Sequence, residues 1–259
     1  MLTRKQFVFL YPVYVVTLLC SRNYKKSLGF VIMFFISFIA ANVSERIYNG
    51  ITAGHYSGIP FTGIQLVVRP LWMANQADAE IFSGLNKKVF VSVLQAMDAR
   101  KVSLSACKEN NLPIQCGYHH FLESYNIICW QILYPILNSY GVNSWWEIDK
   151  LTLSFSYELI RRNPFNYASE YYSAVKNGDG VYYIALLLLL IISSLLDIFR
   201  NNSVRSQILL MVSMMSIANI LLVSIVEPLL QRYTFYTSFL QIAMIIVLLY
   251  QPWKIECVE

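Results

Sequence analysis

Two long apolar runs near the C-terminus, separated by one short charged segment, constrain the fold of this chain most strongly. Ser206–Val226 and Tyr233–Tyr250 are each long enough to cross most of the ~30 Å hydrocarbon core of a bilayer as a helix. The segment between them is so short that the chain must re-enter the membrane from the side on which it left. We therefore expect Glu227 and Arg232 at the bilayer interface, where charges are costly unless they are paired or used.

The rest of the sequence has the composition of an all-α polytopic membrane protein. Hydrophobic residues make up 56% of the chain and charged residues only 14%, and the apolar residues are clustered in runs. Leu28–Val43 and Val181–Phe199 are further predicted spans, whereas Phe7–Cys20 is short for a span and has a signal peptide as its rival interpretation. The sequence thus predicts four or five transmembrane helices.

Short basic loops set the predicted orientation. Arg22, Lys25 and Lys26 lie in one loop and Arg200 and Arg205 in another, so both loops should be cytoplasmic. The predicted organisation is two membrane segments in 1–43, a helix-rich exocytoplasmic domain in 44–180 and three spans in 181–259 with a cytoplasmic C-terminus. We expect the membrane to be a bacterial inner (plasma) membrane. This threading leaves the N-terminus outside, which indicates either that Phe7–Cys20 does not span or that earlier membrane helices precede it.

Local signals predict several helices within the exterior segment. Ser144-Trp145-Trp146-Glu147 is a capping box for a helix ending near Arg162, and Asn163-Pro164 can begin a second helix that stops at Gly178. Other expected features are a helix in Lys87–Lys101 with Phe90, Val93, Leu94 and Met97 on one face, a kink at Pro135 within the apolar stretch Tyr118–Tyr140, and a loop in Gly54–Gly63.

The cysteines and histidines of the exterior segment indicate structure rather than chemistry. Cys107 and Cys116 bracket a polar loop on the side where oxidation is permitted, so a disulfide between them is predicted, while Cys129 should be a buried thiol. Cys116, His119 and His120 offer zinc-binding residue types. However, adjacent histidines diverge on a helix and no fourth ligand stands at a familiar spacing, so no metal site is predicted.

Several functional classes lack their signatures in this chain. There is no glycine-rich phosphate loop, no dinucleotide fingerprint and no Gly-x-Ser-x-Gly nucleophile elbow, and so no cofactor is predicted. The net charge of +5 arises from the N-terminal region, where basic residues flank apolar runs. That placement favours membrane lipid headgroups as partners and argues against nucleic acid.

Glu227 and Arg232 have two interpretations. They can be an interfacial ion pair that caps two helices, or Arg232 can bind a phosphate through its planar fork of donors, with Tyr233 adding one more donor. Exterior acids such as Asp78 and Glu80 are expected to serve helix caps, helix pairs and solubility, whereas Glu45 follows a span directly and must lie at the interface. Asp197 and Arg200, three residues apart, predict a plain ion pair.

Two short motifs resemble a known enzyme class. Glu227-Pro228…Arg232-Tyr233 before the last span, and Leu159-Ile160-Arg161-Arg162-Asn163-Pro164-Phe165-Asn166-Tyr167 before the preceding pair of spans, resemble the C-terminal part of polytopic GT-C-type glycosyltransferases. The resemblance covers residues 145–250. It implies transfer of a sugar from a polyprenyl-phosphate carrier in cell-envelope glycan synthesis, with Arg232 holding the carrier phosphate and Tyr233 and Glu227 beside it.

The chain departs from that family in its N-terminal part. Such enzymes place a catalytic carboxylate in the first exterior loop of a longer chain, and nothing here matches that loop, so the catalytic residue is unidentified and Glu45 is a candidate. The resemblance therefore implies either an unusual enzyme or a C-terminal half whose partner is a second membrane subunit. Two alternatives are a non-catalytic membrane subunit or assembly factor that docks a partner through Trp145-Trp146, and a flippase for lipid-linked glycans.

Overall fold

The computed structural model describes residues 24–58, 60–109, 117–178, 181–201 and 203–226, together with the single residues Val13, Val15, Phe239 and Ile242. Every regular element among these residues is a helix, which confirms the predicted all-α class. The described chain divides into two compact units. A helical unit comprises 42–178 and 223–226, and a membrane-type unit comprises 24–41 and 181–222.

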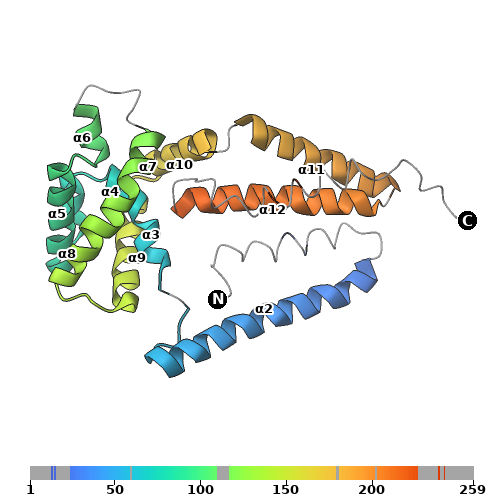
Figure 1. Cartoon of the computed structure of the whole chain (residues 1–259), viewed down its shortest axis with the longest axis horizontal. Coiled ribbons are helices and arrows are strands. Elements are labelled where there is room, and N and C mark those ends of the chain that lie inside the picture. Colours follow the sequence, from blue (N-terminus) through green and yellow to red (C-terminus); the bar gives the residue numbers. More distant parts are fainter. Residues whose placement is uncertain are drawn as a thin grey trace, which may run out of the picture. The chain divides into compact units, whose positions relative to one another are not determined.

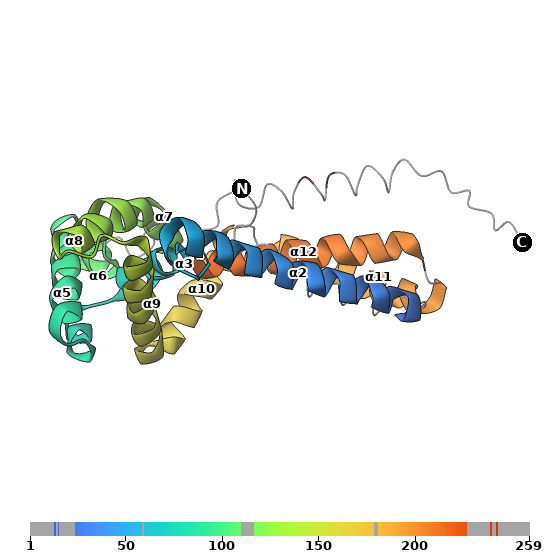
Figure 2. The same ribbon diagram turned by 90° about the horizontal axis from the view of Figure 1, so that it is seen from below.

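The helical unit is built from short helices around a central pair (Figures 1 and 2). The central pair, α3 (Thr62–Leu66) and α4 (Val68–Met73), packs against α9 (Trp145–Arg162), and α4 also packs against α7 (Tyr118–Asn126). The remaining elements are η2 (Gln76–Ile81), α5 (Gly84–Ala99), α6 (Leu104–Glu109), η3 (Ile127–Leu133), α8 (Tyr134–Ser139) and α10 (Pro164–Gly178).

One face of α5 supplies much of the core. Phe90, Val93, Leu94 and Met97, the residues expected on that face, are all buried, as is Val89. Phe82 lies against both Phe90 and Phe155 with ring centroids 4.7 Å apart, which joins α5 to α9. Helical periodicity therefore predicted both this helix and its buried face correctly.

The apolar stretch around Pro135 forms one continuous helical path with an irregular middle. α7 and α8 are joined through η3, a π-helical segment that directly precedes Pro135. A proline cannot donate to the preceding turn and its ring crowds that turn, and a wider turn accommodates both effects. A π segment thus lies N-terminal to the proline, and the predicted kink at Pro135 stays a prediction.

α9 and α10 have the predicted bounds but not the predicted cap. α9 runs from Trp145 to Arg162 and α10 from Pro164 to Gly178. Ser144 occupies the N-cap position with an extended backbone, but its side chain makes no capping hydrogen bond, so the predicted capping box is wrong. The position of a cap follows from the sequence, whereas its hydrogen bonds depend on the side-chain rotamer.

The loop after α2 (Tyr24–Ala53) lies where glycines and a proline predict it. Gly54 has a φ of 74°, a left-handed conformation suited to glycine just beyond a helix end. After the loop, the Gly63 amide donates to a carboxylate oxygen of Asp149 at 2.6 Å. A side chain at Gly63 would collide with the backbone of α9, so glycine permits the close packing of α3 on that helix.

The membrane-type unit contains two helices that are long and apolar enough to cross a bilayer. They are α11 (Val181–Asn201) and α12 (Val204–Val226), each with a mean hydropathy of 2.4 over its apolar window, and they lie side by side in Figures 1 and 2. Within the described residues these two are the candidate spans. The predicted span Leu28–Val43 lies inside α2, and the predicted segments Phe7–Cys20 and Tyr233–Tyr250 fall outside the described ranges.

Asp197 joins α11 to α12 in a way that differs from the predicted ion pair with Arg200. Its carboxylate accepts a hydrogen bond from the Asn201 amide at 2.7 Å and another from the Ser206 hydroxyl of α12. The predicted ion pair between Asp197 and Arg200 was wrong. The carboxylate of Asp197 is instead hydrogen-bonded to Asn201, one turn away on α11, and to Ser206 on α12. The bond from Ser206 links the two candidate spans, whereas the bond from Asn201 lies within α11.

Candidate functional site

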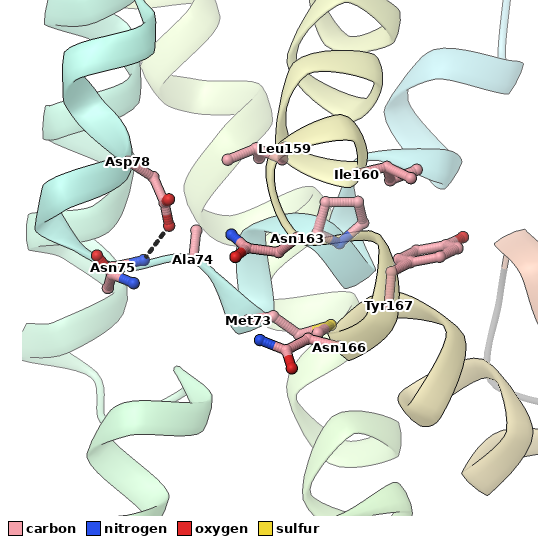
Figure 3. Close-up of a pocket in the computed structure, with 10 residues that line it drawn as sticks. Met73, Ala74, Asn75, Asp78, Leu159, Ile160, Asn163, Asn166 and Tyr167 are labelled. Atoms are coloured by element: carbon pink, nitrogen blue, oxygen red, sulfur yellow. Dashed lines mark hydrogen bonds between the residues drawn. The ribbon is translucent and has the colours of Figure 1, made fainter.

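A small polar pocket lies where α9 meets α10 (Figure 3). Asn75 and Asp78 come from the η2 region on one side, and Asn163, Asn166 and Tyr167 come from the helix junction on the other. Its volume is about 60 Å³, room for roughly two water molecules and too little for a sugar ring. The run Leu159–Tyr167, which carries half of the family resemblance, forms much of this pocket's wall.

Asp78 is fully engaged in holding the pocket wall together. Its carboxylate accepts from the Asn75 backbone N–H at 2.9 Å and pairs with the Arg162 guanidinium at 3.0 Å, and the Asn75 side chain completes a capping box on η2. This confirms the predicted capping role of Asp78. These contacts give Asp78 a structural role at the pocket wall.

Tyr167 connects the pocket to the end of α12. Its hydroxyl donates to the backbone carbonyl of Ile225 at 2.9 Å, and both residues belong to the helical unit. Burial raises the pKa of the Tyr167 phenol, partly opposed by the positive charge of Arg69. The phenol therefore stays protonated at neutral pH and remains a hydrogen-bond donor. Ile225 stands two residues before Glu227 in the sequence.

Arg69 is a buried cation beside Tyr167 that sequence reasoning missed. It is 1% exposed, donates to the Glu170 backbone carbonyl at 3.0 Å and lies 4.6 Å from the centre of the Phe121 ring. Burial lowers its pKa, while Tyr167 and Glu170 act in the opposite direction. Arg69 thus ties α4 to α7 and α10. An arginine inside the apolar run Ile64–Met73 was the sequence signal that could have identified it.

A second and larger concavity lies on the other side of Asn75. Its volume is about 640 Å³, and η2, α5 and α6 contribute to its wall. Five polar side chains face it together with four apolar ones: Asn75, Gln76, Asp98, Lys101 and Ser105, with Ala74, Ala77, Leu94 and Ala106. This volume lies within the range of sites that bind small organic molecules.

The residues predicted to bind the carrier phosphate lie outside the described ranges. Glu227, Arg232 and Tyr233 follow directly on the described end of α12 at Val226 and stay predictions. Glu45, the candidate base, lies on α2 and is half-buried, in the part of that helix that belongs to the helical unit. The described contacts join the motif that ends at Tyr167 to α12. The role of Glu45 as a base stays a prediction.

The cysteines agree with their predicted roles as far as they are described. Cys107 is disulfide-bonded, and Cys129 is a free, buried thiol, as expected. Cys107 and Cys129 are the cysteines among the described residues. The predicted partner of Cys107, Cys116, lies outside the described ranges.

His120 is occupied by structural contacts. Its Nδ1 accepts from the Trp72 indole at 3.1 Å and its Nε2 lies 3.4 Å from the Lys101 carbonyl, which fixes the Nε2–H tautomer. Within the described part of the chain, no three His, Cys, Asp or Glu side chains are grouped to hold a metal ion. The histidine therefore links α7 to the end of α5.

Trp145 and Trp146, proposed above as a docking surface, are packed within the helical unit. Trp145 stacks on Tyr134 with centroids 5.0 Å apart, and Trp146 stacks on His55 at 4.3 Å. Both residues are half-buried. A change at either position would alter folding stability whether or not a partner binds there.

Comparison of the chain with known protein families, curated proteins and solved structures finds no match.

Proposed function

We propose that this chain is a membrane glycosyltransferase, or the C-terminal half or subunit of one, that uses a polyprenyl-phosphate-linked sugar in cell-envelope glycan synthesis. One observation carries the proposal: the hydrogen bond from Tyr167 to the carbonyl of Ile225. Tyr167 ends one of the two family-like motifs, and Ile225 lies two residues before the other. A direct contact thus joins the first motif to the end of α12, the helix that leads into the second motif.

The chemistry of the second motif suits a lipid-carried phosphate. An arginine at the membrane interface can hold two phosphate oxygens at once, and a neighbouring tyrosine hydroxyl adds a third hydrogen bond. In the proposed reaction an acceptor hydroxyl oxygen bonds to the anomeric carbon while the carbon–phosphate oxygen bond breaks. The phosphate leaves with the bonding electrons, stabilised by Arg232, and a carboxylate takes the hydroxyl proton.

Glu45 is our candidate for that carboxylate, and a second membrane subunit is the alternative source. Glu45 lies on α2, a helix that exposes many apolar side chains, among them Ile32, Met33, Phe35 and Ile36. The exposure of these apolar side chains supports contact between lipid and α2, the helix that carries Glu45. It accords with our proposal of further spans beyond α11 and α12.

The disulfide at Cys107 supports an exocytoplasmic location for the helical unit. Disulfides persist in oxidising compartments such as the bacterial periplasm and are rare in the cytosol. We therefore place 44–180 outside a bacterial inner membrane and the C-terminus in the cytoplasm.

Native mass spectrometry of gently extracted protein tests the proposal. We expect wild type to carry a polyprenyl-phosphate mass that Arg232→Ala loses. Arg205→Ala is the matched control, because Arg205 stands at the opposite end of α12 and is exposed. A second membrane polypeptide in the spectrum would identify the chain as a subunit. Equal lipid occupancy in all three proteins, or none in any, would overturn the proposed carrier site.

A further inference from the structure

We propose that the concavity bounded by η2, α5 and α6 binds a neutral saccharide, with Lys101 as a ligand-binding residue. This inference rests on the proposed function, because the saccharide would be the sugar acceptor of the same transferase. The concavity lies within the helical unit and shares Asn75 with the small pocket at the α9–α10 junction.

The lining of the concavity matches the hydrogen-bonding needs of sugar hydroxyls. Its amide side chains, Asn75 and Gln76, each offer both donors and acceptors. Asp98 and Lys101 add one negative and one positive group, so their formal charges cancel and favour a ligand without net charge. A volume of about 640 Å³ accommodates one or two pyranose rings.

Lys101 adopts a backbone conformation that a lysine rarely takes. Its φ is 55°, and it is the one non-glycine residue with positive φ in the described part of the chain. It occupies the position after the C-cap of α5, where its backbone amide donates to the Asp98 backbone carbonyl at 3.0 Å and the Val102 amide donates to the Met97 carbonyl at 3.1 Å. Glycine is the usual residue at this position of such a helix-ending motif, because it lacks the steric cost.

Neighbouring side chains hold the strained backbone in place. Trp72, 1% exposed, donates to His120, and the other nitrogen of His120 reaches the carbonyl of Lys101 at 3.4 Å. The buried tryptophan and the half-buried histidine thus hold the backbone of Lys101 in an unfavourable conformation. Lys101 lines the concavity.

Asp98 is also fixed before any ligand binds. The hydroxyl of Ser103, a residue that is 1% exposed, donates to one Asp98 oxygen at 3.1 Å, and Ser103 in turn lies 3.0 Å from the Ser105 hydroxyl. Two groups on the concavity wall, Asp98 and Ser105, are thereby linked through one buried serine. Such preorganisation lowers the entropy cost of binding.

Lys101→Gly separates a binding role from a structural one. Glycine removes the strain, so the melting temperature of the full chain in detergent should rise by about 2–4 °C. Saturation-transfer NMR measures sugar binding. The neutral probes are N-acetylglucosamine, galactose and mannose, and the charged comparisons are glucuronate and glucosamine. We expect a saturation-transfer signal from wild-type protein to at least one neutral sugar. The glycine variant should bind that sugar with an affinity lower by about tenfold or more.

Lys88→Ala is the control, since it removes an exposed lysine of α5 that does not line the concavity. It should bind the neutral sugar as wild type does. A Lys101→Gly protein that is stabilised yet binds sugar normally would show that Lys101 is not a ligand. Saturation transfer to none of the neutral sugars, or to the charged ones alone, would overturn the saccharide site.

The outcome is independent of the lipid test. Loss of sugar binding with Arg232-dependent lipid retention intact would remove the acceptor site and leave the carrier site standing. Sugar binding without any retained polyprenyl phosphate would keep the concavity as a saccharide site and remove the transferase proposal.

Discussion

Gly63 is the residue at which the packing of α3 against α9 leaves least room for change. A methyl group there would lie closer than 3.0 Å to the Asp149 carbonyl oxygen, the Thr152 hydroxyl and the Leu153 amide nitrogen. Two of these atoms belong to the backbone of a long helix and cannot move away cheaply. We expect Gly63→Ala to destabilise the helical unit by about 2–3 kcal/mol, seen as a lower midpoint of thermal unfolding by circular dichroism.

Gly117→Ala is the matched control for this substitution. No atom lies within 4 Å of the position that its new methyl group would take. Its unfolding midpoint should fall by less than that of Gly63→Ala, because the new methyl group meets no such backbone atoms and only the N-cap preference for glycine over alanine is lost. A Gly63→Ala protein as stable as the control would contradict the close packing of α3 on α9.

Glu170 gives the helical unit a pH dependence. Burial raises the pKa of its carboxyl above the ordinary value of 4.5, although Arg69 and Lys108 oppose the shift. The folded state therefore binds the proton more tightly than the unfolded chain. The stability that this provides is complete below pH 4.5 and is lost as the pH rises through the raised pKa.

Glu170→Gln should remove that loss, because the amide stays neutral at every pH. We expect the melting temperature of the variant, relative to wild type, to increase as the pH is raised from about 4 to 7. Thermal melts of both proteins across this range provide the measurement. A difference that stays constant or shrinks with rising pH would show that Glu170 is not held as described.

Among the elements of the helical unit, α10 contacts the end of α12, which belongs to the same unit. The bond from the Tyr167 hydroxyl to Ile225 is a single contact between side chain and backbone. Tyr167→Phe removes it at a cost of about 1 kcal/mol. We expect faster hydrogen exchange of backbone amides in 223–226, because the variant leaves the Ile225 carbonyl without this bond.

Tyr172→Phe serves as the comparison, since Tyr172 also lies on α10 but is 63% exposed. Exchange in 223–226 should match wild type in this protein. If both tyrosine variants exchange at the wild-type rate, the bond to Ile225 does not control the end of α12.

The element pattern of the helical unit was largely predictable, whereas its polar contacts were not. Periodic apolar residues identified α5 and its buried face, and proline with glycine marked α10 at both ends. Ser144 and Asp197 show the limit. Each stands where a local rule predicts a particular partner, and each has a different hydrogen-bonding pattern in the structure. Where a polar side chain can reach several partners, three-dimensional packing decides which hydrogen bond it forms.

The candidate site was predictable in its motifs but not in its cavities. The run Leu159–Tyr167 stood out in the sequence, and it lines the pocket of Figure 3. Arg69 and Lys101 did not stand out, because their significance comes from residues more than fifteen positions away, such as Glu170 and His120. Long-range contacts of this kind leave no periodic trace in a single sequence.

At the scale of the whole molecule, we propose that residues 227–233 bind a lipid-linked sugar donor. α11 and α12 are the candidate spans among the described residues, and the Tyr167–Ile225 bond lies within the helical unit. The saccharide concavity belongs to the helical unit alone. The account therefore assigns the donor and the acceptor to different sets of residues.

Photocrosslinking with a polyprenyl phosphate that carries a diazirine next to its phosphate tests this account most directly. The full chain in native-like lipid is irradiated and the labelled peptides are identified by mass spectrometry. We predict adducts in 223–233 that excess unlabelled polyprenyl phosphate removes and that Arg232→Ala weakens strongly. Adducts confined to other parts of the chain, or spread over α11 and insensitive to competition, would contradict the proposed donor site.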